Sequence, residues 1–251
     1  MRFVRSAILH NVLVVIVLGA VWQLAVAGLD VPARYVPAPS VIAQAVIVQP
    51  AAFAAALGTT LLEAALGIIS GTLVGVMSGV AFFRSPLLER IFFPYFVASQ
   101  AVPIIAFGVF VVMWFGNGLG SKVFIALYLT FFPVSVNTLL GLRSVNGQQI
   151  DLLRSFGAGQ REIFFKLQLP AALPSIFTAV RLGASLALVG AIVGEWFGAQ
   201  SGLGAILLLS MFNYSMPEMW AAIVLTGFAG GILFLVVALL QSRLAWWQEE
   251  L

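Results

Sequence analysis

The sequence predicts an all-α, polytopic membrane protein with six transmembrane helices. Of its 251 residues, 62% are hydrophobic and 8% are charged, whereas soluble domains carry about 25% charged residues. The few charges fall between long apolar runs, most of them close to the roughly 20 residues that a membrane-spanning helix needs. Lipid is therefore the expected solvent for most of this surface, and residues 1–251 are expected to form one membrane domain.

The predicted spans are apolar runs separated by charged turns or by turns rich in proline and glycine. They are residues 7–29, 57–83, 96–115, 123–142, 171–197 and 217–241. The first run is too long for the core of a signal peptide, which favours a retained helix. A proline-rich loop follows it, with a short amphipathic helix expected from Ser40 to Val48 on the membrane surface.

The second span carries glycines at every fourth position. On a helix this spacing forms a ridge without side chains, which lets a neighbouring helix approach closely. Close packing within the subunit is the favoured interpretation, and a role in a gating motion is the alternative. The ridge consists of Gly67, Gly71, Gly75 and Gly79. Glu63, in the same span, is expected near its outer end at the membrane interface.

Polar residues in or beside the later spans are candidates to line a pathway. The third span is expected to be kinked by its prolines, and Gln100 lies within it. Asn137 in the fourth span is costly in hydrocarbon unless it is paired, so it lines a pathway or makes a hydrogen bond between helices. Glu195, at the far end of the fifth span, lines an entrance or bonds the loop that follows. Arg181 is expected in the first turns of the fifth span.

The longest charged segment covers residues 143–170. A helix is expected from Gln148 to Phe156, a sharp break at Gly157, and a second helix that Pro170 ends. The apolar face of this segment suits either a groove on a soluble partner or the lipid headgroups, and the pattern favours neither.

Charge asymmetry predicts the orientation of the chain. Arg34 and Lys122 are the only lysine or arginine residues outside the segments assigned to the cytoplasmic side. By the positive-inside rule, both chain termini are cytoplasmic.

Several kinds of chemistry have no basis in the sequence. The chain has no cysteine and one histidine, and it contains neither GxSxG nor HExxH, so no catalytic residues and no metal site are expected. The run GNGLGSK lacks the Gly-Lys step of a phosphate loop, and the scattered cations do not indicate nucleic acid. The centres of the spans hold almost no ionisable residues, which favours a conduit driven by a partner over an ion-coupled carrier or channel.

The charged segment resembles the coupling motif of ABC-importer permeases, written EAA, three residues, Gly, nine residues, Ile-x-Leu-Pro. Asp151 stands at the Glu, Leu152 and Leu153 at the alanines, Gly157 at the Gly, Leu167 at the Ile, and Leu169-Pro170 at the closing pair. Where the motif has Glu-Ala-Ala, this sequence has Asp-Leu-Leu. YVPAPSVI, LPAALPSIFTAVRLG and GEWFGAQSGLGAIL resemble the nitrate, sulfonate and taurine group, and within it the riboflavin and hydroxymethylpyrimidine permeases.

This resemblance implies a type I ABC-importer permease fold with a cytoplasmic coupling helix. It implies a homodimer in the bacterial plasma (inner) membrane, with a cytoplasmic ATPase dimer and an external substrate-binding protein. ATP and Mg would bind to the ATPase, and this chain would bind no cofactor. The residues implied to contact the ATPase are Asp151, Leu152, Leu153, Arg154, Ser155, Phe156, Gly157, Ala158, Leu169 and Pro170. A vitamin or heterocyclic precursor is the expected solute, with sulfonate, taurine or nitrate as the alternative.

Overall fold

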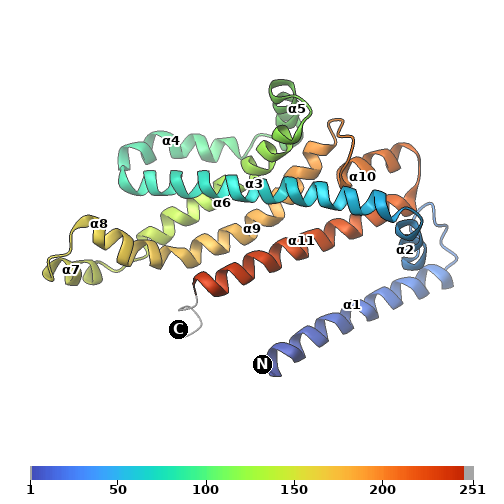
Figure 1. Ribbon diagram of the computed structural model, residues 1–251, viewed down its shortest axis with the longest axis horizontal. Coiled ribbons are helices and arrows are strands. Elements are labelled where there is room, and N and C mark those ends of the chain that lie inside the picture. The colour runs from blue at the N-terminus through green and yellow to red at the C-terminus, as the bar shows by residue number, and fades with distance from the viewer. Residues whose placement is uncertain (1, 246–251) are drawn as a thin grey trace.

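The computed structural model describes residues 2–245, with side chains from residue 13 onward, and this part of the chain is helical with no β-strand (Figure 1). The all-α class is therefore confirmed. The predicted position of the two chain ends concerns residues outside this range. The helices are α1 (Arg2–Gly28), α2 (Pro39–Val48), α3 (Pro50–Arg84), α4 (Pro86–Ser99), α5 (Ile104–Phe115), α6 (Leu119–Arg143), α7 (Gly147–Ser155), α8 (Gln160–Ile163), the π-helical η1 (Phe164–Gln168), α9 (Leu169–Glu195), α10 (Leu203–Phe212) and α11 (Met216–Leu244).

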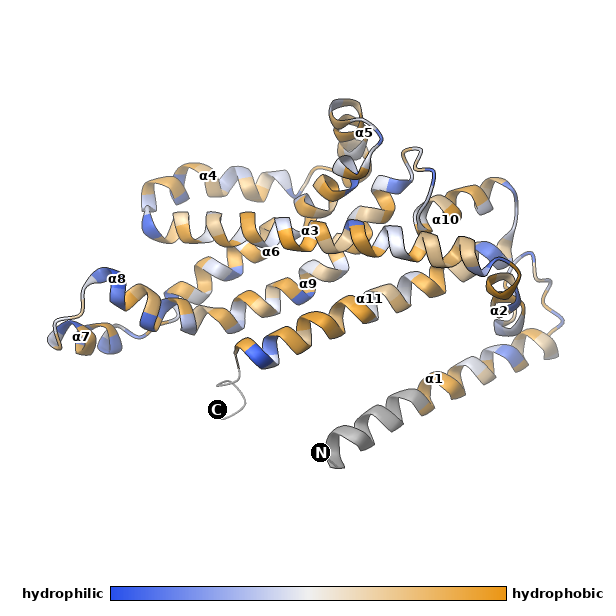
Figure 2. Ribbon diagram, viewed as in Figure 1, coloured by the Kyte–Doolittle hydropathy of each residue, from blue (hydrophilic) through white to orange (hydrophobic). Residues whose placement is uncertain are grey.

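Four helices of the described chain are long and apolar enough to cross a membrane: α3, α6, α11 and the continuous helix Gln160–Glu195. They run side by side (Figure 1), contain the second, fourth and sixth predicted spans, and contain the fifth except for its last two residues. Figure 2 shows hydrophobic residues along their lengths and hydrophilic residues gathered around α7 and α8. We call this end of the bundle the α7 end and the opposite end, where α2 and α10 lie, the α10 end.

The first predicted span is the single helix α1. Its described side chains, from Leu13 to Gly28, are apolar except for Gln23, and most are exposed. The helix lies apart from the main bundle in Figure 1 and contacts α2. The Trp22 ring packs 5.3 Å from the Trp220 ring of α11, and this contact anchors α1 at the α10 end.

The third predicted span, residues 96–115, is bent as its prolines predicted, and the bend is sharp enough to break the helix. The chain forms two helices, α4 and α5, bent by 103° across a break of residues 100–103. Pro103 has no N–H to donate and disfavours a helical conformation at the residue before it, so the break falls there. Tyr128 of α6 donates a hydrogen bond to the Ser99 carbonyl, one of the acceptors that the break frees. If the bent pair is one span, the described residues provide five spans in all.

Pro170 does not end the second helix of the charged segment, and this prediction was wrong. Pro170 lies at the start of α9, within a continuous helix of 36 residues from Gln160 to Glu195. The turns before it are π-helical, and this wider spacing tolerates a residue without an N–H. Arg181 consequently lies past the midpoint of this helix and not in its first turns. Its guanidinium carbon is 5.5 Å from the Phe234 ring centroid.

The glycines of α3 face α6 at close range. A Cβ added to Gly71 would lie 2.6 Å from Thr130 Cβ, and one added to Gly75 would lie 2.7 Å from the Phe131 carbonyl oxygen. Both distances are too short for non-bonded atoms, so neither site has room for a larger residue. The same helix α6 also meets Gly190 of α9, where a Cβ would lie 2.7 Å from Ala126 Cα. The central helices α3, α6 and α9 therefore pack with their backbones nearly in contact.

Candidate functional site

At the α7 end, a short helix and a tight turn project from the bundle. The Asn146 side chain caps α7 by accepting a hydrogen bond from the Gln148 N–H at 3.0 Å. Gly157 then has a φ of +83°, a left-handed conformation that disfavours other residues. The chain turns there and begins α8, where the Gly159 N–H donates to Glu162 Oε2 at 3.3 Å.

The rest of the chain leaves α7 uncovered. None of its residues is buried, and Leu152 and Phe156 are 58% and 79% exposed. Two surface ion pairs lie here, Arg154 with Asp151 at 3.2 Å and Lys166 with Glu162 at 2.9 Å. Exposed apolar side chains rimmed by charge are typical of a contact surface for another molecule.

The base of this projection is fixed to the bundle. Phe164 of η1 is buried, and the Arg84 guanidinium carbon at the end of α3 lies 4.4 Å from its ring centroid. Leu169 packs against the main hydrophobic core. Of the predicted coupling residues, those from Asp151 to Ala158 therefore lie on the projection, whereas Leu169 and Pro170 lie where it enters the bundle.

At the α10 end, Glu195 holds the start of α10. Its carboxylate is fully buried, accepts from Thr60 Oγ1 at 2.6 Å and accepts from the Gly204 N–H at 2.5 Å. The Thr60 hydroxyl in turn accepts from the Leu203 N–H at 2.8 Å. These bonds satisfy two of the N–H groups that a helix N-terminus leaves free. Gly202 has a φ of +120°, and a Cβ there would collide with the Glu195 carboxylate.

Two further charged side chains are buried beside Glu195. Glu63 of α3 and Lys122 of α6 are only 4% and 3% exposed. The Lys122 ammonium donates to the Asn117 carbonyl at 2.9 Å and to Asn117 Oδ1 at 2.5 Å. Asn117 in turn donates to the Gly198 carbonyl at 2.5 Å. We call Glu63, Lys122 and Glu195 the buried charge cluster.

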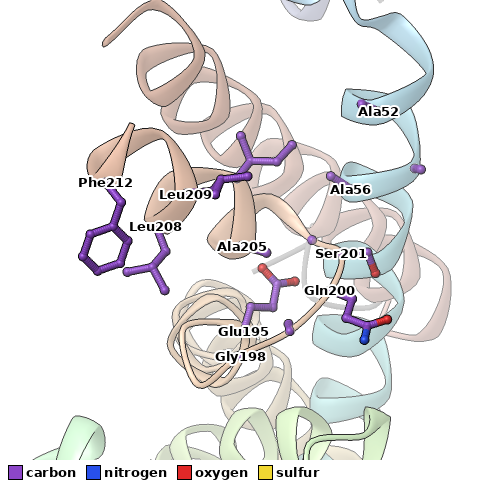
Figure 3. Close-up of a pocket in the computed structure, with 14 residues that line it drawn as sticks. Ala52, Ala56, Glu195, Gly198, Gln200, Ser201, Ala205, Leu208, Leu209 and Phe212 are labelled. Carbon is purple, nitrogen blue, oxygen red and sulfur yellow. The ribbon is translucent and has the colours of Figure 1, made fainter. Parts of the chain in front are cut away.

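Two hollows flank the loop between α9 and α10. One, of about 450 Å³, is lined by Glu195, by Ala52 of α3 and by Leu208 of α10. Figure 3 shows the Glu195 side chain projecting toward Ala205 at this hollow. The other, of about 400 Å³, is lined by Glu63, Lys122 and their polar neighbours. Glu195 thus borders a hollow and bonds the first turn of α10, beyond the loop that follows α9.

The structure does not bring the predicted pathway residues together. Gln100 is exposed at the break between α4 and α5, where it donates to Ser99 Oγ at 3.3 Å. Asn137 is half-buried and donates to the Pro133 carbonyl of its own helix at 2.8 Å. Of the two alternatives for Asn137, the hydrogen bond between helices is therefore not formed in the described chain.

Sequence reasoning missed the burial of Glu63 and Lys122. Glu63 was expected at the membrane interface, and Lys122 was counted among the charges on the outer side of the membrane. The spacing contains the information that places them: Glu63 precedes Gly67 by four residues and Lys122 precedes Ala126 by four. Both therefore continue helix faces that pack against each other.

Comparisons with known proteins identify the family. Residues 71–247 match the family model described as binding-protein-dependent transport system inner membrane component. The chain is 32% identical to the formylaminopyrimidine transport permease protein ThiX of Halalkalibacterium halodurans, over 96% of this chain and 97% of the relative. It is 29% identical to the taurine transport system permease protein TauC of Escherichia coli, over 77% of this chain and 70% of the relative.

A solved structure shares the fold. A chain of the MetNI methionine ABC transporter, in an inward-facing conformation, superposes with a TM-score of 0.67 over 75% of this chain and 94% of that chain. The identity is 18%, so this likeness concerns the fold alone. Taken with the family model, these matches make the protein a multi-pass transport subunit and not an enzyme. The chain belongs to the family of binding-protein-dependent transport system inner membrane components, the permease subunits of ABC importers.

Proposed function

We propose that two copies of this chain form the translocation pathway of an ATP-driven importer in the bacterial plasma membrane. Each copy would cross the membrane six times, with α1 and the bent α4–α5 pair completing the set and both termini in the cytoplasm. The observation that carries the proposal is the uncovered projection at the α7 end, which holds the segment that resembles the coupling motif.

The projection would seat in a cleft of a cytoplasmic ATPase dimer. Its exposed Leu152 and Phe156 would be the apolar contacts, with Asp151 and Arg154 at the rim. ATP and Mg would bind to the ATPase, and this chain would hold no cofactor. Closure of the ATPase pair would move α7 as a rigid body and switch the pathway between inward and outward access.

An external binding protein would deliver the solute to the α10 end. We propose a nitrogen-containing vitamin precursor as the solute, because the match to the formylaminopyrimidine permease is higher and longer than the match to the taurine permease. Sulfonate, taurine or nitrate is the alternative. The buried Glu63 and Glu195 carboxyl groups favour a solute without a net negative charge.

The coupling proposal is tested by a matched pair of proline substitutions at the two ends of α7. Gly157→Pro requires a φ near −65° where the chain has +83°. We expect it to abolish solute uptake and solute-stimulated ATP hydrolysis, with membrane insertion unchanged. Gly147→Pro is the control, because Gly147 is the first residue of α7, where proline is tolerated.

The measurement uses membranes in which the chain is co-expressed with its ATPase. An ATP-hydrolysing subunit should co-purify with the parent protein and with the Gly147→Pro variant. Normal uptake by the Gly157→Pro variant would show that α7 is not the coupling element. Solute transport by the purified chain alone, without ATP, would overturn the importer assignment and favour a channel or carrier.

A further inference from the structure

The hollow beside Glu63 differs from the rest of the molecule because its lining is polar. Its volume is about 400 Å³, and its polar lining residues are Thr59, Glu63, Asn117, Lys122, Gln200 and Ser201. They come from α3, from the start of α6 and from the two loops that precede α6 and α10. Asn117, Gln200 and Ser201 are exposed, whereas Glu63 and Lys122 are buried, so the two charges lie at the floor.

Glu63 is the group at this floor whose bonding is incomplete. Its Oε2 atom is buried and has no N–H or O–H donor among the described residues, and its carboxyl group lies against that of Glu195. Glu195 already accepts from Thr60 and from Gly204, one bond on each oxygen. A buried carboxyl oxygen that has lost its water and has no hydrogen-bond donor is energetically unfavourable. Glu63 therefore has an unfilled requirement for a hydrogen-bond donor.

Lys122 provides the complementary group. Its ammonium has three N–H donors, and two of the bonds are made to Asn117. One donor is left for another acceptor. The floor of the hollow thus presents an acceptor at Glu63 and a donor at Lys122, and both side chains border the same space.

We propose that this hollow is a binding site for a small nitrogen heterocycle that carries an amino group. The amino N–H would donate to Glu63, and a ring nitrogen or carbonyl of the same solute would accept from Lys122. A sulfonate without an amino group, or a nitrate, has no N–H for Glu63 and would bring a second negative charge beside it, so the site disfavours such anions. The inference rests on the proposed function and gives that pathway an entry site at the α10 end.

The test measures binding of radiolabelled formylaminopyrimidine to the full chain in lipid nanodiscs, with butanesulfonate as competitor. We expect saturable binding that butanesulfonate does not displace. Glu63→Gln replaces one acceptor oxygen with an amide donor and should weaken binding about tenfold or more, the value of one charge-assisted hydrogen bond. Lys122→Met should weaken binding in the same direction.

Glu89→Gln is the matched control, because Glu89 makes its contact with Arg143 at the α7 end. The Glu89→Gln variant should bind formylaminopyrimidine with the same affinity as the parent chain. Size-exclusion profiles should show that all variants are folded. Three results would each overturn the inference: absence of binding, displacement by butanesulfonate, or equal affinity after Glu63→Gln. Equal affinity after Glu63→Gln would mean that Glu63 interacts only with Glu195 and not with the solute. None of these results affects co-purification with an ATPase or the Gly157→Pro result, so the proposed function stands or fails separately.

Discussion

The two ends of the molecule use charged residues in opposite ways. At the α7 end, Arg143, Arg154 and Lys166 form ion pairs whose side chains are 25–74% exposed. At the α10 end, Glu63, Lys122 and Glu195 are at most 4% exposed. Exposed pairs are screened by water and add little stability, whereas buried charges must be bonded or they destabilise the fold. The charged groups of the α7 end are thus open to solvent, whereas those of the α10 end are enclosed between helices.

The largest effect is expected from breaking the packing that connects the two ends. Gly75→Leu places a side chain where even a Cβ would lie 2.7 Å from the Phe131 carbonyl oxygen of α6. We expect a loss of at least about 3 kcal/mol in the free energy of unfolding, because the helices must separate. Thermal unfolding of the purified chain in detergent measures this effect.

Gly58→Leu is the control for that experiment, since Gly58 lies on the same helix with nothing within 4 Å of an added Cβ. Its melting temperature should match that of the parent chain. Equal stability of the two variants would mean that α3 and α6 are not packed as described.

An intermediate effect is expected at the buried charge cluster. Glu195→Ala removes the acceptor of the Gly204 N–H and one of two acceptors of the Thr60 hydroxyl, the other being the Ala56 carbonyl at 3.1 Å. The loss should be about 2 kcal/mol, the scale for leaving buried donors unsatisfied. Glu195→Gln keeps one acceptor oxygen and should lose less. Both variants can be ranked by thermal unfolding, and equal losses would show that size and not hydrogen bonding matters at this position.

The smallest effect is expected at the α7 end. Glu89→Gln removes the charge that faces Arg143 at 2.5 Å, where the two side chains are 25% and 46% exposed. The expected loss is below about 1 kcal/mol, as for other exposed pairs. A shift as large as that of Glu195→Ala would contradict the contrast drawn between the two ends. Added salt should reduce the difference from the parent chain.

The sequence was sufficient to predict the class and the course of most helices, because the bilayer imposes long apolar runs that are visible without a structure. The glycine ridge also predicted close packing of α3. The positions at which helices end were harder to predict. Pro103 ends a helix and Pro170 does not, because the π-helical turns of η1 precede Pro170 and no local pattern distinguishes the two. Lys122 is buried because it lies on the same face of α6 as Ala126. That this face is buried can be known only once the pairing of α3 with α6 is known.

The helix from Gln160 to Glu195 has a mechanical consequence. At about 1.5 Å per residue, its 36 residues form a rod roughly 54 Å long that joins the projection at one end to Glu195 at the other. A tilt of about 5° about one end of such a rod displaces the other end by about 5 Å. That displacement exceeds the 2.5 Å bond between Glu195 and the Gly204 N–H. A swing of this helix therefore either carries α10 with it or detaches α10.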